Sequence, residues 1–512
     1  MADIVPTKKE KCQGAMLAAA IGDALGWPNE RTQDKTQSSN NADEMFVSWT
    51  RVNRYPYWYQ ERILPGEYSD DTQLILAVAR SILTKNWNHH FFVYELPYWL
   101  LYERGGGKAL KNAARACKNN IVLWRQKNSQ EYFNAGGNGV AMRILPHVIG
   151  NENSKDISKL MTEVIQDGII THGHPRALVG ALCYAYALYY LLYKEDILQF
   201  GELVSAVVDA KDIWGVLPNN AELVEWRETA LSQNGYDYMS VWKQTVNQLL
   251  EKLQFIEQTL EKGIIVDDKK VLTELKCFSN IKGAGDISVL AAIYLASKYA
   301  NNPVLGIKVP AFFQGIDTDT VASMTGALLG MICGTGWIPS EWTMVQDYSC
   351  LVKITELLMT DSRLASTKAY TKQIINNDLN WIQTPMGMAY GSESYAIKCK
   401  RGEVIINKLK TAFGQTIYLK RYHELENDIN KENNETYSNI KTRNQENVSQ
   451  LRFNVNYSDV SELLKCKKLT KKTVSKMLQV IGALMLGEIP ESIAQKYNVD
   501  IDVVITIKQY IF

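Results

Sequence analysis

Two short acidic segments, each followed by an apolar stretch with helical spacing, hold the residues best suited to chemistry. Residues 69–72 read Ser-Asp-Asp-Thr and residues 317–320 read Asp-Thr-Asp-Thr. Hydroxyl and carboxylate side chains are common where a helix begins, because they accept hydrogen bonds from free backbone N–H groups and face the positive end of the helix dipole. A cap needs only one such residue, so each segment has more acid than capping requires.

Paired carboxylates suit metal binding if the two segments meet in the fold. Neighbouring carboxylates repel one another, so two pairs brought together need cations between them. The ligands on offer are oxygens, which favours Mg²⁺ or Mn²⁺ and argues against zinc. Two such ions about 3.5–4 Å apart commonly activate water and orient a substrate. The alternative is two separate helix caps that never meet.

Four further segments accompany the acidic ones: GAMLAAAIGDALGWPNE (14–30), GGNGVAMRILP (136–146), THGHPRA (171–177) and GTGWIPSEW (334–342). In this order, the segments resemble the ADP-ribosylglycohydrolase family, which includes the dinitrogenase reductase-activating glycohydrolase and the ADP-ribosyl-acceptor hydrolases. The resemblance covers residues 10–350, and several motifs in order are more specific than one. It implies an all-α fold with two Mg²⁺ ions, cleaving an N- or O-glycosidic bond at C1″ of ADP-ribose.

The resemblance also implies roles for individual residues. The metal ligands that it implies are Ser69, Asp70, Asp71, Asp317, Asp319 and Thr320. The catalytic residues that the resemblance implies are Glu30, Asp71 and Asp317, and Glu30 matches the acid that follows the family's Gly-Asp-x-x-Gly motif. Two positions depart from the family pattern, because Ser69 stands where Thr is usual and Ile316 where Gly is common.

A glycine-rich segment and a histidine are the implied contacts with ADP-ribose. Gly137, Asn138 and Gly139 match a loop that approaches the diphosphate or ribose, and glycine permits close backbone approach. His172 matches a family histidine near the ligand. A tight turn and a structural histidine would explain the same residues. Residues 102–107 lie where the family often has a glycine-rich loop with an acid, but no acid there can be assigned as the general base.

Composition narrows the class of protein. The chain has 512 residues, with 56 Lys and Arg against 55 Asp and Glu, so no overall charge favours nucleic acid. No apolar run is long enough to span a bilayer, so no membrane partner is expected. The eight cysteines are scattered without a C-x-x-C pair, which predicts reduced thiols and a cytoplasmic protein.

The elements that must position the site are helices. Small and apolar residues at helical spacing dominate residues 1–350, the expected catalytic domain, with additional helices at 195–280. Residues 351–423 form an extension of unknown fold, in which 403–408 predict a strand. Residues 424–454 are rich in Asn, Glu, Lys and Gln and predict a flexible linker.

Residues 455–512 predict a small helical module at the C-terminus. Its pattern of short helix, turn and second helix is similar to a helix-turn-helix. Nucleic-acid binding by this module is weakly supported, because its second helix offers Asp502 and Lys508 but no arginine to read guanine. The upstream lysines of 465–472 could meet phosphates or form a solvated face.

Three functions compete. The leading one is a hydrolase that removes ADP-ribose from an acceptor, which is a protein side chain, a nucleic acid or a small molecule. The second is a catalytically silent ADP-ribose-binding protein, which the four retained carboxylates disfavour. The third is a nucleic-acid-directed regulator that uses the C-terminal module. The sequence does not decide among arginine, serine, a nucleobase and a small molecule as acceptor.

Overall fold

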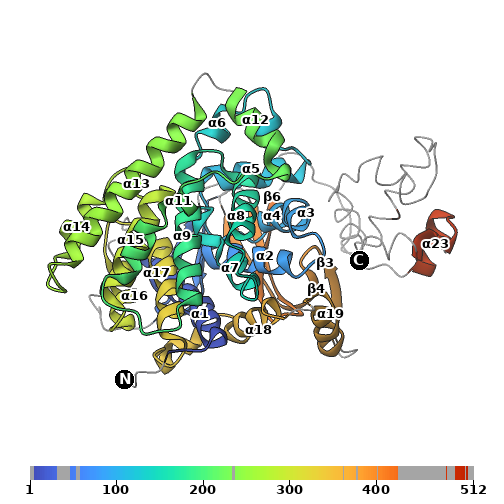
Figure 1. Ribbon diagram of the computed structural model, residues 1–512. Helices are drawn as coiled ribbons and strands as arrows, with labels where there is room; N and C mark the ends of the chain where they lie inside the picture. The colour runs from blue at the N-terminus through green and yellow to red at the C-terminus, as the bar shows by residue number, and fades with distance from the viewer. Residues whose placement is uncertain are drawn as a thin grey trace.

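The computed structural model describes residues 5–30, 46–53, 58–232, 237–360, 363–375, 379–399 and 402–424, together with 480, 490–501 and 503–505 near the C-terminus. These residues are mostly helical, with a two-stranded and a four-stranded antiparallel sheet. The four-stranded sheet lies beside the helices (Figure 1). The expectation of an all-α fold is therefore wrong in one respect, because the chain has a four-stranded sheet after its helical body. No helix in the described ranges is long and apolar enough to cross a membrane.

The α-helices are, in chain order, α1 (Lys8–Gly26), α2 (Asp70–Ile82), α3 (Trp87–His90), α4 (Leu96–Trp99), α5 (Lys108–Lys118), α6 (Gln130–Phe133), α7 (Leu145–Gly150), α8 (Ile157–Thr171), α9 (Pro175–Tyr193), α10 (Glu202–Asp209), α11 (Lys211–Trp214), α12 (Val224–Ser232), α13 (Tyr238–Leu260), α14 (Asp268–Glu274), α15 (Gly285–Tyr299), α16 (Pro303–Phe312), α17 (Thr318–Cys333), α18 (Tyr348–Leu358), α19 (Arg363–Ile374) and α23 (Pro490–Tyr497). Short 3-10 or π turns are η1 (Trp27–Asn29), η2 (Phe91–Glu95), η3 (Leu123–Arg125), η4 (Ala141–Arg143), η5 (Ala221–Leu223) and η6 (Ser340–Met344). Helices α10 to α14 occupy the segment in which additional helices are predicted.

Helices α1 and α17 form the central antiparallel pair of the helical body (Figure 1). Small residues face one another every fourth position, which lets the two backbones touch. A Cβ added at Gly22 would lie 2.2 Å from the Ala322 carbonyl oxygen, and one at Gly26 would lie 2.3 Å from that of Thr318. This contact continues to the far ends of both helices, where Gly330 meets the backbone of Gly14. The pairing therefore fixes where the end of α1 meets the start of α17.

Two sheets pack beside this body. Strands β1 (Trp49–Asn53) and β2 (Tyr59–Ile63) form a hairpin, and β3 (Trp381–Thr384), β4 (Gly387–Cys399), β5 (Gly402–Thr411) and β6 (Thr416–Glu424) form an antiparallel sheet in the order β3-β4-β5-β6. The strand that the sequence predicts at 403–408 lies within β5. Tyr59 of the hairpin packs against Val404, Ile406 and Tyr418, so the two sheets are joined to each other. The Lys420 backbone N–H donates to the Leu101 carbonyl, which joins the four-stranded sheet to the helical body.

The remaining predicted segments fall largely outside the described residues. This applies to the linker predicted at 424–454, apart from the last residue of β6. Within the module predicted at 455–512, the helix α23 and a few neighbouring residues are described. The helix-turn-helix pattern therefore stays a prediction.

Candidate active site

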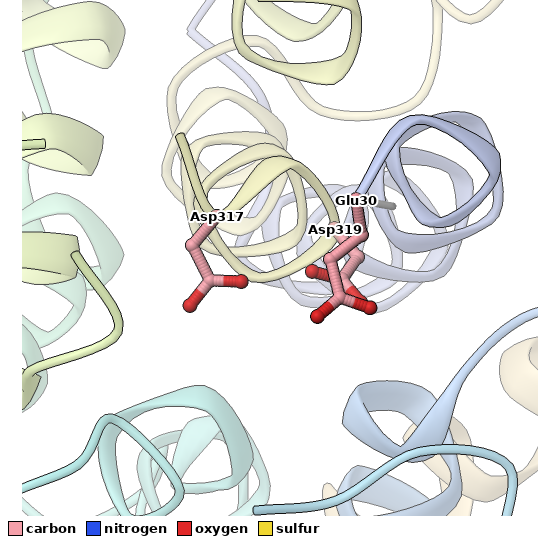
Figure 2. Close-up of side chains that lie close together, drawn as sticks. All are labelled: Glu30, Asp317 and Asp319. Carbon is pink, nitrogen blue, oxygen red and sulfur yellow. The ribbon is translucent and has the colours of Figure 1, made fainter. Parts of the chain in front are cut away.

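Three carboxylates meet where α1 and α17 come together. Glu30 follows the turn η1 at the end of α1, Asp317 immediately precedes α17, and Asp319 lies in its first turn. One carboxylate oxygen from each lies within 4.8 Å of the others. Figure 2 shows the three side chains at the ends of the two helices, with the carboxylates pointing in the same direction. The close helix pairing therefore brings together acids that are far apart in sequence.

The first acidic segment lies against the second. Thr320 donates a hydrogen bond from Oγ1 to Asp71 Oδ2 at 3.3 Å, and Ser69 donates to the same oxygen at 3.4 Å. The other oxygen, Asp71 Oδ1, is buried and has no hydrogen-bond partner among the described residues. The two segments are therefore not separate helix caps, and Asp71 presents an unsatisfied acceptor at their meeting point.

Ser69 is the N-cap of α2, and its Oγ accepts from the Asp71 backbone N–H at 3.3 Å. An acid on α1 satisfies other donors at the same helix end. Asp23 is fully buried on α1, and its Oδ1 accepts from the Ser69 backbone N–H at 3.0 Å. Its Oδ2 accepts from the backbone N–H of Thr72 at 3.0 Å and from the Thr72 hydroxyl at 2.6 Å. Because Asp23 satisfies these donors, Asp70 and Asp71 are released from a capping role. Asp317 occupies the N-cap position of α17 but makes no side-chain capping bond either.

Several buried carboxyl groups lie close together in the site, and this raises their pKa values. Burial raises the pKa of Asp71 and Asp319 well above the usual range, and the charges of neighbouring acids raise it further. Burial, with the charge of Asp23, raises the pKa of Asp70 to about 7. Cations among these groups would favour their charged forms. The all-oxygen donors and the unsatisfied Asp71 oxygen fit Mg²⁺ or Mn²⁺.

The glycine-rich loop at 104–107 lies directly on Asp70. A Cβ at Gly105 would lie 1.9 Å from Asp70 Oδ1, and Gly105 has a φ of +148°. Gly106, with a φ of +79°, donates a backbone hydrogen bond that lowers the pKa of Asp70. The sequence signal for this contact is the run of three glycines, but only the fold shows which acid the run approaches.

The second glycine loop also reaches the acids. Asn138 donates from Nδ2 to Asp317 Oδ2 at 2.7 Å and to Ser288 Oγ at 3.0 Å. Its backbone N–H donates to the Gly283 carbonyl at 2.9 Å, and Gly137 pairs with Ala284. Asn138 therefore orients Asp317, a role that the sequence interpretation as a substrate contact did not include.

His172 supports this loop from behind. It is buried, and a Cβ at Gly139 would lie 2.9 Å from its Cε1. Thr171 Oγ1 lies 2.8 Å from His172 Nδ1. Burial, together with the charge of Arg143, lowers the pKa of His172 to about 3, so the ring is neutral. Packing against the loop accounts for its position, and direct contact with a substrate stays a prediction.

A cavity of about 430 Å³ lies next to the acids. Its lining residues are Asn134, Gly136, Gly137, His174, Arg176, Asn280, Ile281, Gly283 and Ala284. A Cβ at Gly283 would lie 3.1 Å from Asp317 Oδ2, so the cavity adjoins the acidic cluster. Sequence reasoning missed Arg176 and the loop at 280–284, although Arg176 belongs to the quoted segment at 171–177.

Comparison with known proteins agrees with these features. The family model described as ADP-ribosylglycohydrolase matches residues 5–368. A relative named as an ADP-ribosyl glycohydrolase, from Acanthamoeba polyphaga mimivirus, is 25% identical over 207 residues, which are 38% of this chain and 60% of the relative. The ADP-ribosyl-[dinitrogen reductase] glycohydrolase of Rhodospirillum rubrum is 25% identical over 191 residues, 36% of this chain and 60% of that protein.

Two further similarities are longer. An uncharacterized protein of Archaeoglobus fulgidus is 24% identical over 338 residues, 65% of this chain and 90% of that protein. A solved structure titled ADP-ribosylglycohydrolase-related protein complex has a TM-score of 0.41 and 19% identity, covering 69% of this chain and 99% of the other. The chain thus spans 60% of the length of the mimivirus and Rhodospirillum relatives.

Proposed function

Because the chain belongs to the ADP-ribosylglycohydrolase family, we propose that it is a metal-dependent hydrolase that cleaves the glycosidic bond between ADP-ribose and an acceptor. The observation that carries the proposal is the meeting of Asp71 with the acids around Asp317, beside a cavity lined by glycine loops. A purely structural role would not explain so many buried carboxylates around an unsatisfied oxygen.

The oxygen ligands would come from three segments. They are Ser69, Asp70, Asp71, Asp317, Asp319 and Thr320, and the distances add Glu30 to this group. Bound there, two Mg²⁺ or Mn²⁺ ions would compensate the carboxylates, orient the ribose hydroxyls and lower the pKa of a water. Glu30 and Asp317 are partly exposed, whereas Asp319 is buried. A substrate therefore meets Glu30 and Asp317 before it meets Asp319.

The protein's own groups suit an oxocarbenium-like transition state. Positive charge develops at C1″ as the bond to the acceptor breaks, and carboxylates held nearby stabilise that charge. Asn138 fixes the direction of the Asp317 carboxylate, and the close α1–α17 contact fixes Glu30 relative to it. Such groups need little rearrangement during the reaction, which is the main source of electrostatic catalysis.

The cavity offers a place for the rest of ADP-ribose. Gly136 and Gly137 form one side of it, and Gly283 and Ala284 form another. Arg176 contributes a positive charge on the wall, held by an ion pair with Asp286 at 2.8 Å. Backbone N–H groups of glycine loops and a guanidinium are common partners of a diphosphate.

The direct test is a panel of substrates. Arg-ADP-ribosylated peptide, Ser-ADP-ribosylated peptide and ADP-ribosylated DNA are incubated with the full chain, with and without Mg²⁺, and released ADP-ribose is measured by chromatography. Metal-dependent release from at least one substrate supports the proposal and identifies the acceptor. Binding of ADP-ribose without release from any substrate would instead favour the silent binding protein.

A further inference from the structure

We propose that Lys420, on the last strand of the C-terminal sheet, is a positioning residue for Asp70 in the metal site. The inference rests on the proposed function but concerns a part of the chain beyond the family match, which ends at residue 368. It assigns the sheet β3–β6 a role in the active site.

The first link joins α2 to the glycine loop. Gln73, on the first turn of α2, donates from Nε2 to the Tyr102 carbonyl at 3.1 Å. Its Oε1 accepts from the Arg104 backbone N–H at 3.1 Å. Gly105 then touches Asp70, with no space for a side chain between them. A shift of the loop by a few tenths of an ångström would therefore move Asp70 or open a gap beside it.

The second link joins the opposite side of the loop to β6. The Lys420 backbone N–H donates to the Leu101 carbonyl at 2.8 Å, and Lys420 Nζ donates to the Glu103 carbonyl at 2.8 Å. The Arg104 guanidinium lies 3.8 Å from the centre of the Tyr418 ring, two positions earlier on the strand. The loop is thus held between α2 and the sheet.

The third link is a buried charge network that keeps Lys420 in place. Lys420 is 9% exposed, and its Nζ lies 3.4 Å from Glu61 Oε2 on the hairpin strand β2. Glu61 also pairs with Arg104 at 2.9 Å, while Arg104 pairs with Glu67 at 2.8 Å. Burying a lysine is costly, but the Lys420 ammonium group reaches both Glu61 and the Glu103 carbonyl. Apolar packing alone could attach the sheet to the helices without the cost of burying a charge. The buried lysine is therefore better explained by its contact with the Glu103 carbonyl beside the glycine loop than by attachment of the sheet.

The test measures metal binding directly. Mn²⁺ affinity of the full chain is followed by electron paramagnetic resonance for the wild type, K420M and the control K410M. Lys410 is exposed on the neighbouring strand β5, so the same substitution there leaves the loop untouched. We expect Mn²⁺ affinity to fall about 10-fold or more in K420M, the usual effect of losing a residue that supports a ligand, and to stay unchanged in K410M.

Further measurements separate positioning from stability. K420R keeps the charge and should recover most of the affinity. If K420M does not fold, K420Q replaces it with the same expectation, because its shorter side chain stays polar but does not reach the Glu103 carbonyl. If K420M has a lower Tm but binds Mn²⁺ as tightly as the wild type at a temperature where it is folded, the role of Lys420 in positioning is overturned. The proposed metal-dependent function would then still stand. Absence of Mn²⁺ binding by the wild type would overturn the metal-dependent function as well.

Discussion

The hydrogen bond from Thr320 Oγ1 to Asp71 Oδ2 joins the N-termini of α2 and α17, which lie far apart in the sequence. It leaves Asp71 Oδ1 buried and without a hydrogen-bond partner in the described part of the chain. Buried carboxylate oxygens are costly unless they are paired, protonated or bound to a cation. The relationship therefore links the packing of two helices to the chemistry that their first turns can support.

Removal of divalent metal should abolish hydrolysis. A chelator should remove the ions, and added Mg²⁺ or Mn²⁺ should restore activity. Zn²⁺ should restore it only weakly, because all the proposed ligands are oxygens. The measurement is ADP-ribose release from the best substrate of the panel before and after dialysis against chelator. Full activity in excess chelator would show that the carboxylates work without metal.

Asp71→Asn should lower activity by more than about 100-fold, because it removes a charge from the centre of the site. Loss of a residue that only supports a metal ligand typically costs roughly 10–100-fold. The helix should still form, since Ser69 caps α2 and Asp23 accepts from the Ser69 and Thr72 backbone N–H groups. Asp156→Asn is a matched control, because Asp156 is an exposed N-cap of α8 and asparagine caps a helix about equally well. Circular dichroism and bound Mn²⁺ are measured together with turnover. Normal metal content and normal turnover in D71N would place the site elsewhere.

Gly22→Ala should destabilise the protein and weaken metal binding together. The new Cβ would lie 2.2 Å from the Ala322 carbonyl oxygen, so α1 and α17 must separate and Glu30 must shift relative to Asp319. Overpacking of this kind typically costs about 1–3 kcal/mol, and more where backbone is the obstacle. Gly336→Ala is the control, because a Cβ there meets open space. Thermal unfolding and Mn²⁺ titration of both variants provide the comparison.

How far the sequence predicts this site depends on whether a contact is local. The two acidic segments can be recognised from the sequence alone. In each, the carboxylates and hydroxyls lie within four consecutive residues and precede an apolar helix. The hydrogen bonds of Asp23 with Ser69 and Thr72 cannot be recognised in this way. They join two helices that are far apart in the sequence, and no residue spacing predicts such a contact. The contact of Gly105 with Asp70 is equally non-local, and a triple glycine alone does not say what approaches it.

The sheet shows the same division. In β5, Val404 and Ile406 are buried on one face, and the run of β-branched residues predicts a strand locally. Strand β4 contains a bulge between Gly391 and Glu393 and several exposed polar residues, so it carries little strand signal of its own. Its conformation depends on pairing with β3 and β5, which a single sequence does not display.

Stability should fall as pH rises from neutral to about 9, because of His147. Burial would lower its pKa, but the hydrogen bond with Asp167 and the nearby charges of Asp167 and Glu163 outweigh this and raise the pKa of His147 to about 9. A histidine with a raised pKa stabilises the folded state fully below its unfolded pKa of about 6.5, and this contribution is lost as pH rises through the folded value. The loss is about 3 kcal/mol at most.

The comparison for His147 uses two substitutions of the same kind. His147→Gln should remove much of the decrease in unfolding free energy between pH 6.5 and 9, whereas His89→Gln, at an exposed position on α3, should keep it. Denaturant unfolding of the metal-free protein at several pH values measures the effect. An identical pH profile in the wild type and H147Q would show that His147 does not gain a proton on folding.

A fragment that ends at residue 424 should keep both metal binding and hydrolysis of a small ADP-ribosylated substrate. All proposed ligands lie before residue 321, and the fragment retains β6, with Tyr418 against Arg104 and Lys420 against the Glu103 carbonyl. The composition of 424–454 predicts protease sensitivity there, so limited proteolysis should produce a similar fragment.

A fragment that ends at 415 lacks β6 and should lose Mn²⁺ affinity and activity. If the 424 fragment folds and binds Mn²⁺ but is inactive, residues after 424 contribute to the active site. If the 415 fragment is as active as the full chain, the sheet has no part in positioning Asp70.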